Sequence, residues 1–319
     1  MSSETSPLTV AIDVGPLYGH RTGVGVATAG MVAALGECDT VRLDPFLVSG
    51  RSRPDEGHRR LPLPGIAASH LWSRSGWPNA DRWLDGADVV HGTNYVAPPS
   101  SRPTVVSVYD CWFLRHPELA SPVVRRAGSW LTRLVRQGAW IHTSSSATTD
   151  QIRELFATER VVTIHLGEPA AVSTEPPARP PDGRLAALDG APFAVSIATE
   201  GRRKGLPLAI EAFERLADED ADLRLVLAGA PGDDAAAVSA AIDAATPRAR
   251  RRIVRLGPVD EPTKRWLLAR AAVIAYPTRD EGFGFPILEE NAARVPVVAS
   301  AVGSVRAIAG GAAALVDGR

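Results

Sequence analysis

Apolar and polar positions follow two different patterns along this chain. Short, nearly continuous apolar runs such as Phe193–Ile197 are typical of strands buried in a parallel sheet. Between them lie longer segments with apolar residues at helical spacing, as in Leu206–Leu216. This alternation in both halves of the chain predicts an α/β protein with doubly wound parallel sheets.

The predicted strands form two series. The first comprises Leu8–Val14, Val41–Val48, Asp88–His91, Thr104–Tyr109, Trp140–Thr143 and Arg160–His165. The second comprises Phe193–Ile197, Leu223–Ala228, Ile253–Leu256, Val273–Tyr276 and Val297–Ala299. The segment between the two series is rich in proline and in polar residues, a composition typical of a linker. We therefore predict Rossmann-like domains at 1–168 and 191–319, joined by a linker at 169–190, with ligands bound at the carboxyl ends of the strands.

Composition and charge exclude several classes of protein. The chain has 319 residues, of which 45% are hydrophobic and 22% are charged, enough for two domains that each bury a core. A net charge of −1 argues against a nucleic-acid partner. The two cysteines form no metal or disulfide pattern, and no apolar run is long enough to span a bilayer. We expect a cytoplasmic protein, with peripheral contact at the inner membrane face left open.

The most informative motif follows the predicted strand Val273–Tyr276, and it reads Glu281-Gly282-Phe283-Gly284-Phe285-Pro286-Ile287-Leu288-Glu289. The glycines let the backbone turn and approach a ligand, and the proline suits the first turn of a helix, predicted at 285–294. The free N–H groups at the start of that helix favour an anion such as a diphosphate. The two carboxylates can accept hydrogen bonds from sugar hydroxyls, although either glutamate alone could simply favour a helix start.

A basic turn follows the first strand of the second domain, with the sequence Thr199-Glu200-Gly201-Arg202-Arg203-Lys204-Gly205. Because the turn lies after a strand end, it places cations at the mouth of the cleft that we expect between the two domains. Arg203 and Lys204 there can offset the charge that builds on a departing nucleoside diphosphate. The alternative is a solvated surface turn.

The first domain carries a glycine pair, Gly23 and Gly25, after its first strand. A dinucleotide fingerprint needs its glycines directly after the strand and a third glycine three residues beyond the second. Eight residues separate Val14 from Gly23, and the third position is Thr28. A nicotinamide enzyme is therefore disfavoured.

The string from Glu281 to Glu289, followed by Asn291 to Ser300, resembles the E-x7-E region of the GT4 family of retaining GT-B glycosyltransferases. The basic turn, the Gly23–Gly25 loop, the strand ending at Gly229 and the segments Asp88–Tyr95 and Val108–Glu118 resemble the same family. The resemblance implies two Rossmann-like domains that face a central cleft. The carboxyl-terminal domain looks incomplete, because the chain stops where the family continues into further helices.

The resemblance also implies roles for particular residues. Glu281 would contact the donor sugar, Glu289 the ribose, Arg203 and Lys204 the phosphates, and the amides of Gly282, Phe283, Gly284 and Phe285 the sugar or diphosphate. Gly23 and Gly25 would lie over the donor diphosphate, and Gly229 would line the nucleotide pocket. Thr199 stands where many relatives have a second phosphate-binding arginine. No metal or other cofactor is expected.

One departure from the family lies at Tyr109-Asp110, where relatives usually have His-Asp beside the reacting sugar. A tyrosine can donate a hydrogen bond, but with a reference pKa near 10 it is a poor proton acceptor at neutral pH. Asp110 could orient an acceptor hydroxyl or the Tyr109 ring, or it could simply stabilise a turn.

We therefore predict a retaining, metal-independent transferase that moves a hexose from a nucleotide diphosphate sugar to a hydroxyl acceptor. Mannose is one candidate sugar, and the acceptor is a glycan, a lipid or a small molecule. One alternative is a catalytically impaired relative that binds a nucleotide or glycan and serves a partner. Another is an epimerase or phosphorylase of the same architecture. The nucleotide base and the oligomeric state are left open.

Overall fold

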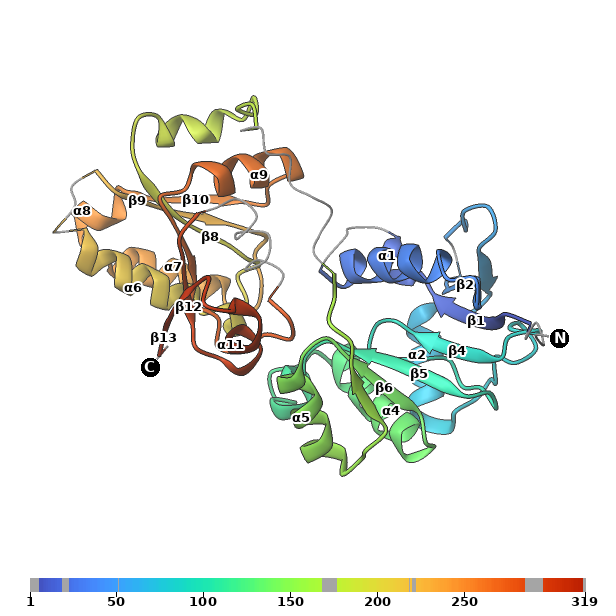
Figure 1. The fold of residues 1–319 in the computed structure, drawn as a ribbon. Helices are drawn as coiled ribbons and strands as arrows, with labels where there is room; N and C mark the ends of the chain where they lie inside the picture. The colour runs from blue at the N-terminus through green and yellow to red at the C-terminus, as the bar shows by residue number, and fades with distance from the viewer. Residues whose placement is uncertain are drawn as a thin grey trace. The chain divides into compact units, whose positions relative to one another are not determined.

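The chain folds into two compact units, Met1–Gly167 and Glu168–Arg319, each with its own sheet and core (Figure 1). The computed structural model describes residues 6–18, 23–50, 52–167, 177–217, 219, 222–284 and 295–317. The predicted helix at 285–294, together with Phe285 and Glu289, lies outside these residues.

The first unit is built on a seven-stranded parallel sheet in the order β3-β2-β1-β4-β5-β6-β7. Its strands are β1 (Leu8–Asp13), β2 (Val41–Val48), β3 (Arg59–Leu61), β4 (Val89–Gly92), β5 (Thr104–Val108), β6 (Trp140–Thr143) and β7 (Val161–Thr163). The winding reverses between β1 and β4. Ligands of such sheets bind beyond the carboxyl ends of the strands at this switch point.

Helices cover both faces of the first sheet (Figure 1). They are the 3-10 helix η1 (Gly15–Leu17), α1 (Gly23–Gly36), α2 (Gly65–Ser75), α3 (Trp112–Arg115), α4 (Pro122–Arg136) and α5 (Ser146–Phe156). Helix α1 packs on the face that carries Val10 and Ile12. Helices α2 and α4 pack with Val106 and Val108 on the other face, around the buried Trp130. Burial of these apolar side chains holds the strand ends in place.

The second unit repeats this winding in a six-stranded parallel sheet with the order β10-β9-β8-β11-β12-β13. Its strands are β8 (Phe193–Ile197), β9 (Arg224–Ala228), β10 (Ile253–Gly257), β11 (Val273–Tyr276), β12 (Val297–Ser300) and β13 (Ala314–Val316). Its switch point lies between β8 and β11. The loops that leave these two strands are therefore the expected place for a ligand.

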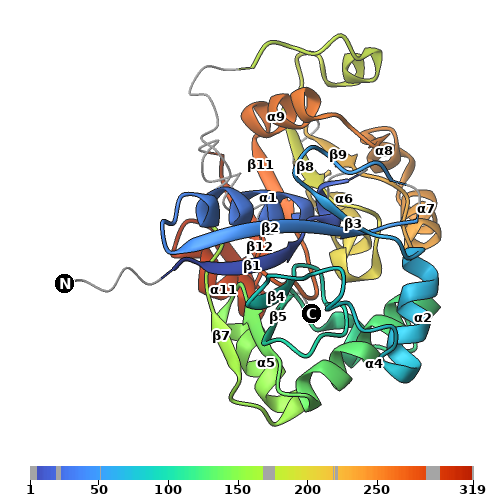
Figure 2. The same ribbon diagram turned by 90° about the vertical axis from the view of Figure 1, so that its right-hand side faces the viewer.

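Figure 2 shows helices on opposite sides of the second sheet, with α9 above and α6 below strands β8 and β9. The helical elements are η2 (Gly183–Leu188), η3 (Arg202–Lys204), α6 (Leu206–Leu216), α7 (Ala235–Ala244), α8 (Pro247–Arg250), α9 (Glu261–Arg270) and α11 (Gly303–Ala309). Helices α6 and α7 pack against Ala194 and Leu225, whereas α9 and α11 pack against Val195 and Val226. Two Rossmann-like units are thus confirmed, as the apolar pattern predicted.

Strands β3 and β13 and the 3-10 helix η2 are among the elements that the sequence analysis did not predict. Strand β3 is only three residues long and begins with two arginines, and β13 is exposed at all three positions. Such edge strands form by pairing with β2 and β12, so the apolar pattern does not reveal them. Helix η2 lies inside the predicted linker, yet its Leu185 and Leu188 are buried in the second core. The prolines before η2 made the whole segment resemble a linker, so the burial of these two leucines was not predicted. None of the helices that the structure describes is long and apolar enough to cross a bilayer.

Candidate functional site

Two loops meet at the switch point of the second sheet, one after β8 and one after β11. The backbone N–H of Arg279 donates to the Arg203 carbonyl at 2.7 Å, and the Thr278 hydroxyl donates to the same oxygen at 3.0 Å. Gly205 has a φ of +62°, and a Cβ atom there would lie 2.1 Å from the Pro277 carbonyl oxygen. Only glycine permits this close approach. The basic turn is therefore fixed against the loop that carries Glu281.

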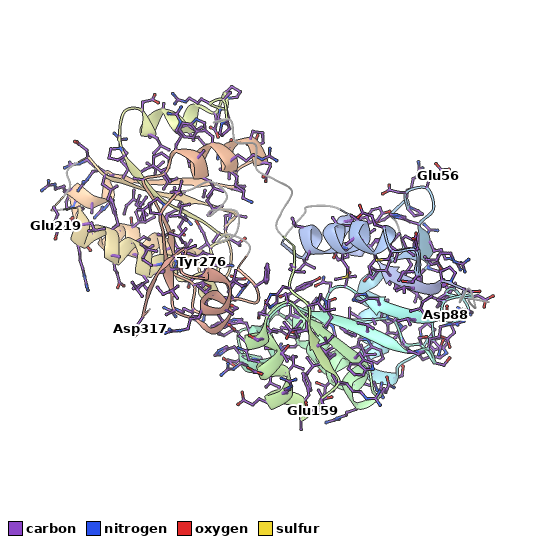
Figure 3. All side chains as sticks on the ribbon, in the orientation of Figure 1. Glu56, Asp88, Glu159, Glu219, Tyr276 and Asp317 are labelled. Carbon is purple, nitrogen blue, oxygen red and sulfur yellow. The ribbon has the colours of Figure 1, made fainter. Side chains whose placement is uncertain are left out.

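Glu281 lies at the centre of a cluster of donors in this loop. Its Oε1 accepts from Arg203 Nη1 at 2.9 Å, and its Oε2 accepts from Lys204 Nζ and, at 2.6 Å, from Tyr276 Oη. The Ser304 hydroxyl donates to the Glu281 main-chain carbonyl. Figure 3 shows the Tyr276 side chain within the second unit, at the end of β11. Residues 77 and 78 positions apart in sequence thus form one polar cluster.

Two cations keep the Glu281 carboxylate ionised. Burial alone would raise the pKa of Glu281, but the charges of Lys204 and Arg203, with hydrogen bonds from Lys204 and Tyr276, lower it to about 2. The carboxylate can therefore accept hydrogen bonds at any physiological pH, but it cannot supply a proton. Lys204 Nζ also lies 5.7 Å from the centroid of the Tyr276 ring, in cation–π range. The basic turn is not a solvated surface turn, because two of its three cations contact Glu281.

The glycine-rich turn after Glu281 is buried. Gly282, Phe283 and Gly284 are all buried, and Gly284 has a φ of +97°, which favours glycine. The chain therefore makes a tight turn just before the residues for which a helix was predicted. Contact of the Gly282, Phe283 and Gly284 amides with a sugar or diphosphate remains a prediction.

The loops after β8 and β9 pack against each other. Gly229 has a φ of +157°, and a Cβ atom there would lie 1.9 Å from the Ala198 carbonyl oxygen. A Cβ atom on Gly232 would lie 3.1 Å from Thr199 Cγ2 and closer still to the Glu200 carbonyl. The glycines therefore let the two loops touch. Backbone packing accounts for Gly229, and its role in lining a nucleotide pocket stays a prediction, as does that of Thr199.

In the first unit, Asp110 stabilises a turn. Its Oδ2 accepts from Tyr95 Oη at 3.1 Å, and its Oδ1 accepts from the backbone N–H of Trp112 at 3.2 Å, in the first turn of α3. This is the structural role that the sequence left open. A second role, in orienting an acceptor hydroxyl, remains a prediction.

Tyr109 lies in an aromatic cluster and is only 7% exposed. Its ring makes edge contacts with Tyr95 and His142, with centroids 6.2 and 6.4 Å apart. Its hydroxyl faces Ser107 and Thr28 without a hydrogen bond of normal geometry in the described part of the chain. Burial raises the pKa of Tyr109 further above neutrality, so it cannot act as a proton acceptor.

Two buried histidines, one of which contacts the Tyr109 ring, form hydrogen bonds with the same serine. His91 Nε2 and His142 Nδ1 each lie 2.9 Å from Ser107 Oγ, and His142 Nε2 lies 3.1 Å from the Ile164 carbonyl oxygen. That carbonyl requires an N–H at His142 Nε2, so Ser107 donates to His142 and accepts from His91. Burial lowers the pKa of both histidines, that of His91 to about 4. They are neutral structural groups. Gly23 and Gly25 lie in the first turn of α1, and Gly25 is buried. Their position over a donor diphosphate remains a prediction.

Comparison with known proteins bears on the second unit. The sequence profile of the glycosyl transferases group 1 family matches residues 193–319, which include β8, the basic turn and Glu281. The matched residues make up most of the second unit, so it is this unit that is similar to group 1 glycosyl transferases. The resemblance to GT-B glycosyltransferases predicted from the sequence is thereby confirmed.

Individual relatives are distant. The serotype-specific mannosyltransferase WbdA of Escherichia coli is 24% identical over 204 residues, which cover 60% of this chain and 25% of that protein. This chain thus corresponds to about a quarter of WbdA. The D-inositol 3-phosphate glycosyltransferase of Jonesia denitrificans is 26% identical over 316 residues, which cover 95% of this chain and 70% of that protein.

Among solved structures, the fold is similar to that of Alr3699/HepE from Anabaena, crystallised in complex with UDP and glucose. The TM-score is 0.66 at 14% identity, with 94% of this chain and 82% of that chain covered. At this identity the similarity establishes the GT-B fold and nothing further.

The second unit also contains a buried ion pair that sequence reasoning missed. Glu200 is 3% exposed, and Arg255 donates to both its oxygens, from Nε at 2.6 Å and from Nη2 at 2.5 Å. The Glu200 backbone bonds to Ala230 and Asp234, each at 2.9 Å. Because Glu200 belongs to the basic turn, the pair ties this turn to β10 and to the loop after β9. A charged residue inside the apolar strand Ile253–Gly257 was the available signal.

Replacing Arg255 with alanine should destabilise the protein by about 2–3 kcal/mol, because it leaves Glu200 buried without its charge partner. The effect falls at the low end for buried pairs, since the Arg255 side chain is 34% exposed. Denaturant unfolding of Arg255→Ala, Glu200→Gln and the double variant would measure the coupling. Additive single effects would contradict a functional pair. Arg265→Ala, which removes a surface pair with Glu261, should change stability by less than about 0.5 kcal/mol.

Proposed function

We propose that this protein moves a hexose from a nucleoside diphosphate sugar to a hydroxyl acceptor, with retention of anomeric configuration and without a metal ion. One observation carries the proposal: Glu281 contacts both Arg203 and Lys204 at the switch point of the second sheet. A carboxylate that binds sugar hydroxyls and cations that bind phosphates are thus adjacent, as the two halves of the donor require.

The cluster suggests how the donor would be held. In the structure, Arg203 and Lys204 share the single negative charge of Glu281, so the cluster keeps a net positive charge. A diphosphate bound at this turn would take over part of that pairing, while Glu281 would accept hydrogen bonds from the sugar. Both cations then lie where negative charge increases as the bond to the leaving group lengthens.

In the proposed reaction, an acceptor oxygen bonds to the anomeric carbon as the bond from that carbon to the phosphate oxygen breaks. The electron pair of the broken bond stays on the diphosphate, and the acceptor proton passes to the departing diphosphate on the same face of the sugar. Arg203 and Lys204 supply the positive charge that a metal would otherwise provide. The names of the relatives make mannose and glucose the first sugars to test and UDP the first nucleotide, and GDP is added because the GT4 resemblance suggests GDP-mannose.

A second candidate function is nucleotide or glycan binding without transfer. The buried hydroxyl of Tyr109 favours it, because this residue replaces the histidine that the family places beside the reacting sugar. In that case the second unit would bind a donor, and the first would not complete a catalytic site.

A donor panel separates these functions. The protein would be mixed with GDP-mannose, UDP-glucose, UDP-galactose or ADP-glucose and a set of alcohol acceptors, and the released nucleoside diphosphate and glycoside would be quantified. We expect one donor to yield a glycoside with the anomeric configuration of the donor, shown by NMR coupling constants. Nucleotide binding without release, measured by calorimetry, would instead establish the second candidate. Donor conversion without an acceptor alcohol would indicate an epimerase, and an inverted product would contradict retention.

A further inference from the structure

Asp13 occupies the switch point of the first sheet, at the carboxyl end of β1 beside β4. Its Oδ1 accepts from the backbone N–H of Gly15 at 2.8 Å, and its main-chain carbonyl accepts from the Thr93 hydroxyl at 2.6 Å. These bonds come from the segments that follow β1 and β4. The carboxylate is therefore fixed at the position where open α/β sheets bind ligands.

The second carboxylate oxygen of Asp13 is available. Oδ2 makes no hydrogen bond or ion pair with any residue that the structure describes. The adjoining elements η1 and α1 contain no charged residue. Strands β2 and β4 contribute titratable or charged groups that bond elsewhere: Asp44 to Arg59, Arg42 to Thr9, and His91 to Ser107. No cation among these groups offsets the charge of Asp13.

Ionising a carboxyl group that is shielded from water and has no cation beside it costs free energy. Burial raises the pKa of Asp13 to about 6, even though the hydrogen bond from Gly15 lowers it. The folded chain thus holds an acidic group near its titration point at neutral pH. In contrast, Asp110 has hydrogen-bond donors on both of its oxygens.

We infer that Asp13 binds a hydroxyl of the sugar acceptor through its Oδ2. This inference rests on the proposed transfer function and adds the residue that orients the acceptor. A neutral alcohol suits the position, because a hydroxyl supplies the donor that Oδ2 lacks. The Thr93 hydroxyl donates to the Asp13 main-chain carbonyl and so fixes the backbone that carries the carboxylate.

Asp13→Asn tests the inference, because asparagine can still accept from Gly15 but presents an NH₂ donor where Oδ2 was. We expect kcat/KM for the acceptor to fall about 10- to 100-fold, as for loss of a hydrogen bond to a charged group, with little change in the KM of the donor. In the wild type, the rate should rise with pH through about 6 as Asp13 ionises. The variant should lose that rise.

Asp88→Asn is the matched control. Asp88 precedes β4 (Figure 3), and its Oδ2 accepts from the backbone N–H of Thr9 at 2.8 Å, near the amino end of β1, whereas Asp13 ends that strand. This variant should keep the pH profile and the acceptor kcat/KM of the wild type.

Thermal unfolding supplies a readout that does not depend on activity. Because the folded pKa of Asp13 exceeds the unfolded value, ionisation costs stability as pH rises from about 4 to 6. The Tm of Asp13→Asn minus the Tm of the wild type should therefore be larger at pH 7.5 than at pH 4. For Asp88→Asn this difference should not change with pH in the same way. If Asp13→Asn matches Asp88→Asn in acceptor kcat/KM or keeps the pH rise, the inference is wrong while transfer by the wild type still stands. If the wild type transfers no sugar to any alcohol, both the inference and the proposed function fail.

Discussion

Glu281→Gln should lower sugar transfer about 100- to 1000-fold, the range for removing one preorganised group from a transition-state site. Glutamine keeps the shape of the side chain but removes the negative charge that holds Arg203 Nη1 and Lys204 Nζ. The two cations would then repel each other and lose the geometry in which they receive the diphosphate. Initial rates with the best donor of the panel, measured at saturating acceptor, would give kcat.

The same substitution should change stability in a pH-dependent way. The folded pKa of Glu281 is about 2, below the unfolded value of about 4.5, so its stabilising effect is present above pH 4.5 and is lost as pH falls toward 2. That effect corresponds to about 3 kcal/mol. Denaturant unfolding between pH 7 and pH 2.5 should show this loss in the wild type but not in Glu281→Gln.

Glu261→Gln provides the matched control for both measurements. Glu261 pairs with Arg265 at 3.3 Å on the surface of α9, and its side chain is 58% exposed. Its replacement should change stability by less than about 0.5 kcal/mol and leave transfer unaffected. If Glu281→Gln retained more than a tenth of wild-type kcat, Glu281 would have no direct part in transfer.

The sequence predicted that the basic turn and the Glu281 loop lie together, because both follow apolar strands. Val273–Tyr276 and Phe193–Ile197 are strands with the predicted bounds, and parallel winding brings their carboxyl ends together. What the sequence did not reveal is that Arg203 and Lys204 both pair with Glu281. Strand patterns fix where a loop begins but not which side chains face one another across two loops.

The features that sequence reasoning missed share a physical cause. Asp13 ends β1 and Glu200 lies in the loop after β8, where a carboxylate is ordinarily a solvated turn residue, and tertiary packing buries Glu200 and partly covers Asp13. Strand β13 is an apolar run of only three residues, and it is exposed throughout, so it is too short to be recognised from the sequence. Burial is set by contacts distant in sequence, so polar residues inside the fold are the hardest to recognise.

Lys204→Met should reduce kcat about 100-fold or more, whereas Arg202→Met should have little effect. Both residues belong to η3, but the Lys204 side chain is 17% exposed and contacts Glu281, while Arg202 is exposed. Methionine keeps the length of the lysine side chain and removes only its charge. Because the charge of Lys204 is proposed to act mainly on the departing diphosphate, the KM of the donor should rise less than kcat falls.

A double variant distinguishes this catalytic role from simple neutralisation of Glu281. Removing Lys204 alone leaves Glu281 with one cation fewer, so Lys204→Met with Glu281→Gln should recover about 1–3 kcal/mol of stability over the sum of the single effects. Transfer should not recover, because the charge needed at the diphosphate is still missing. If the double variant transferred sugar at close to the wild-type rate, Lys204 would serve only to hold Glu281, and the leaving group would be stabilised by other residues.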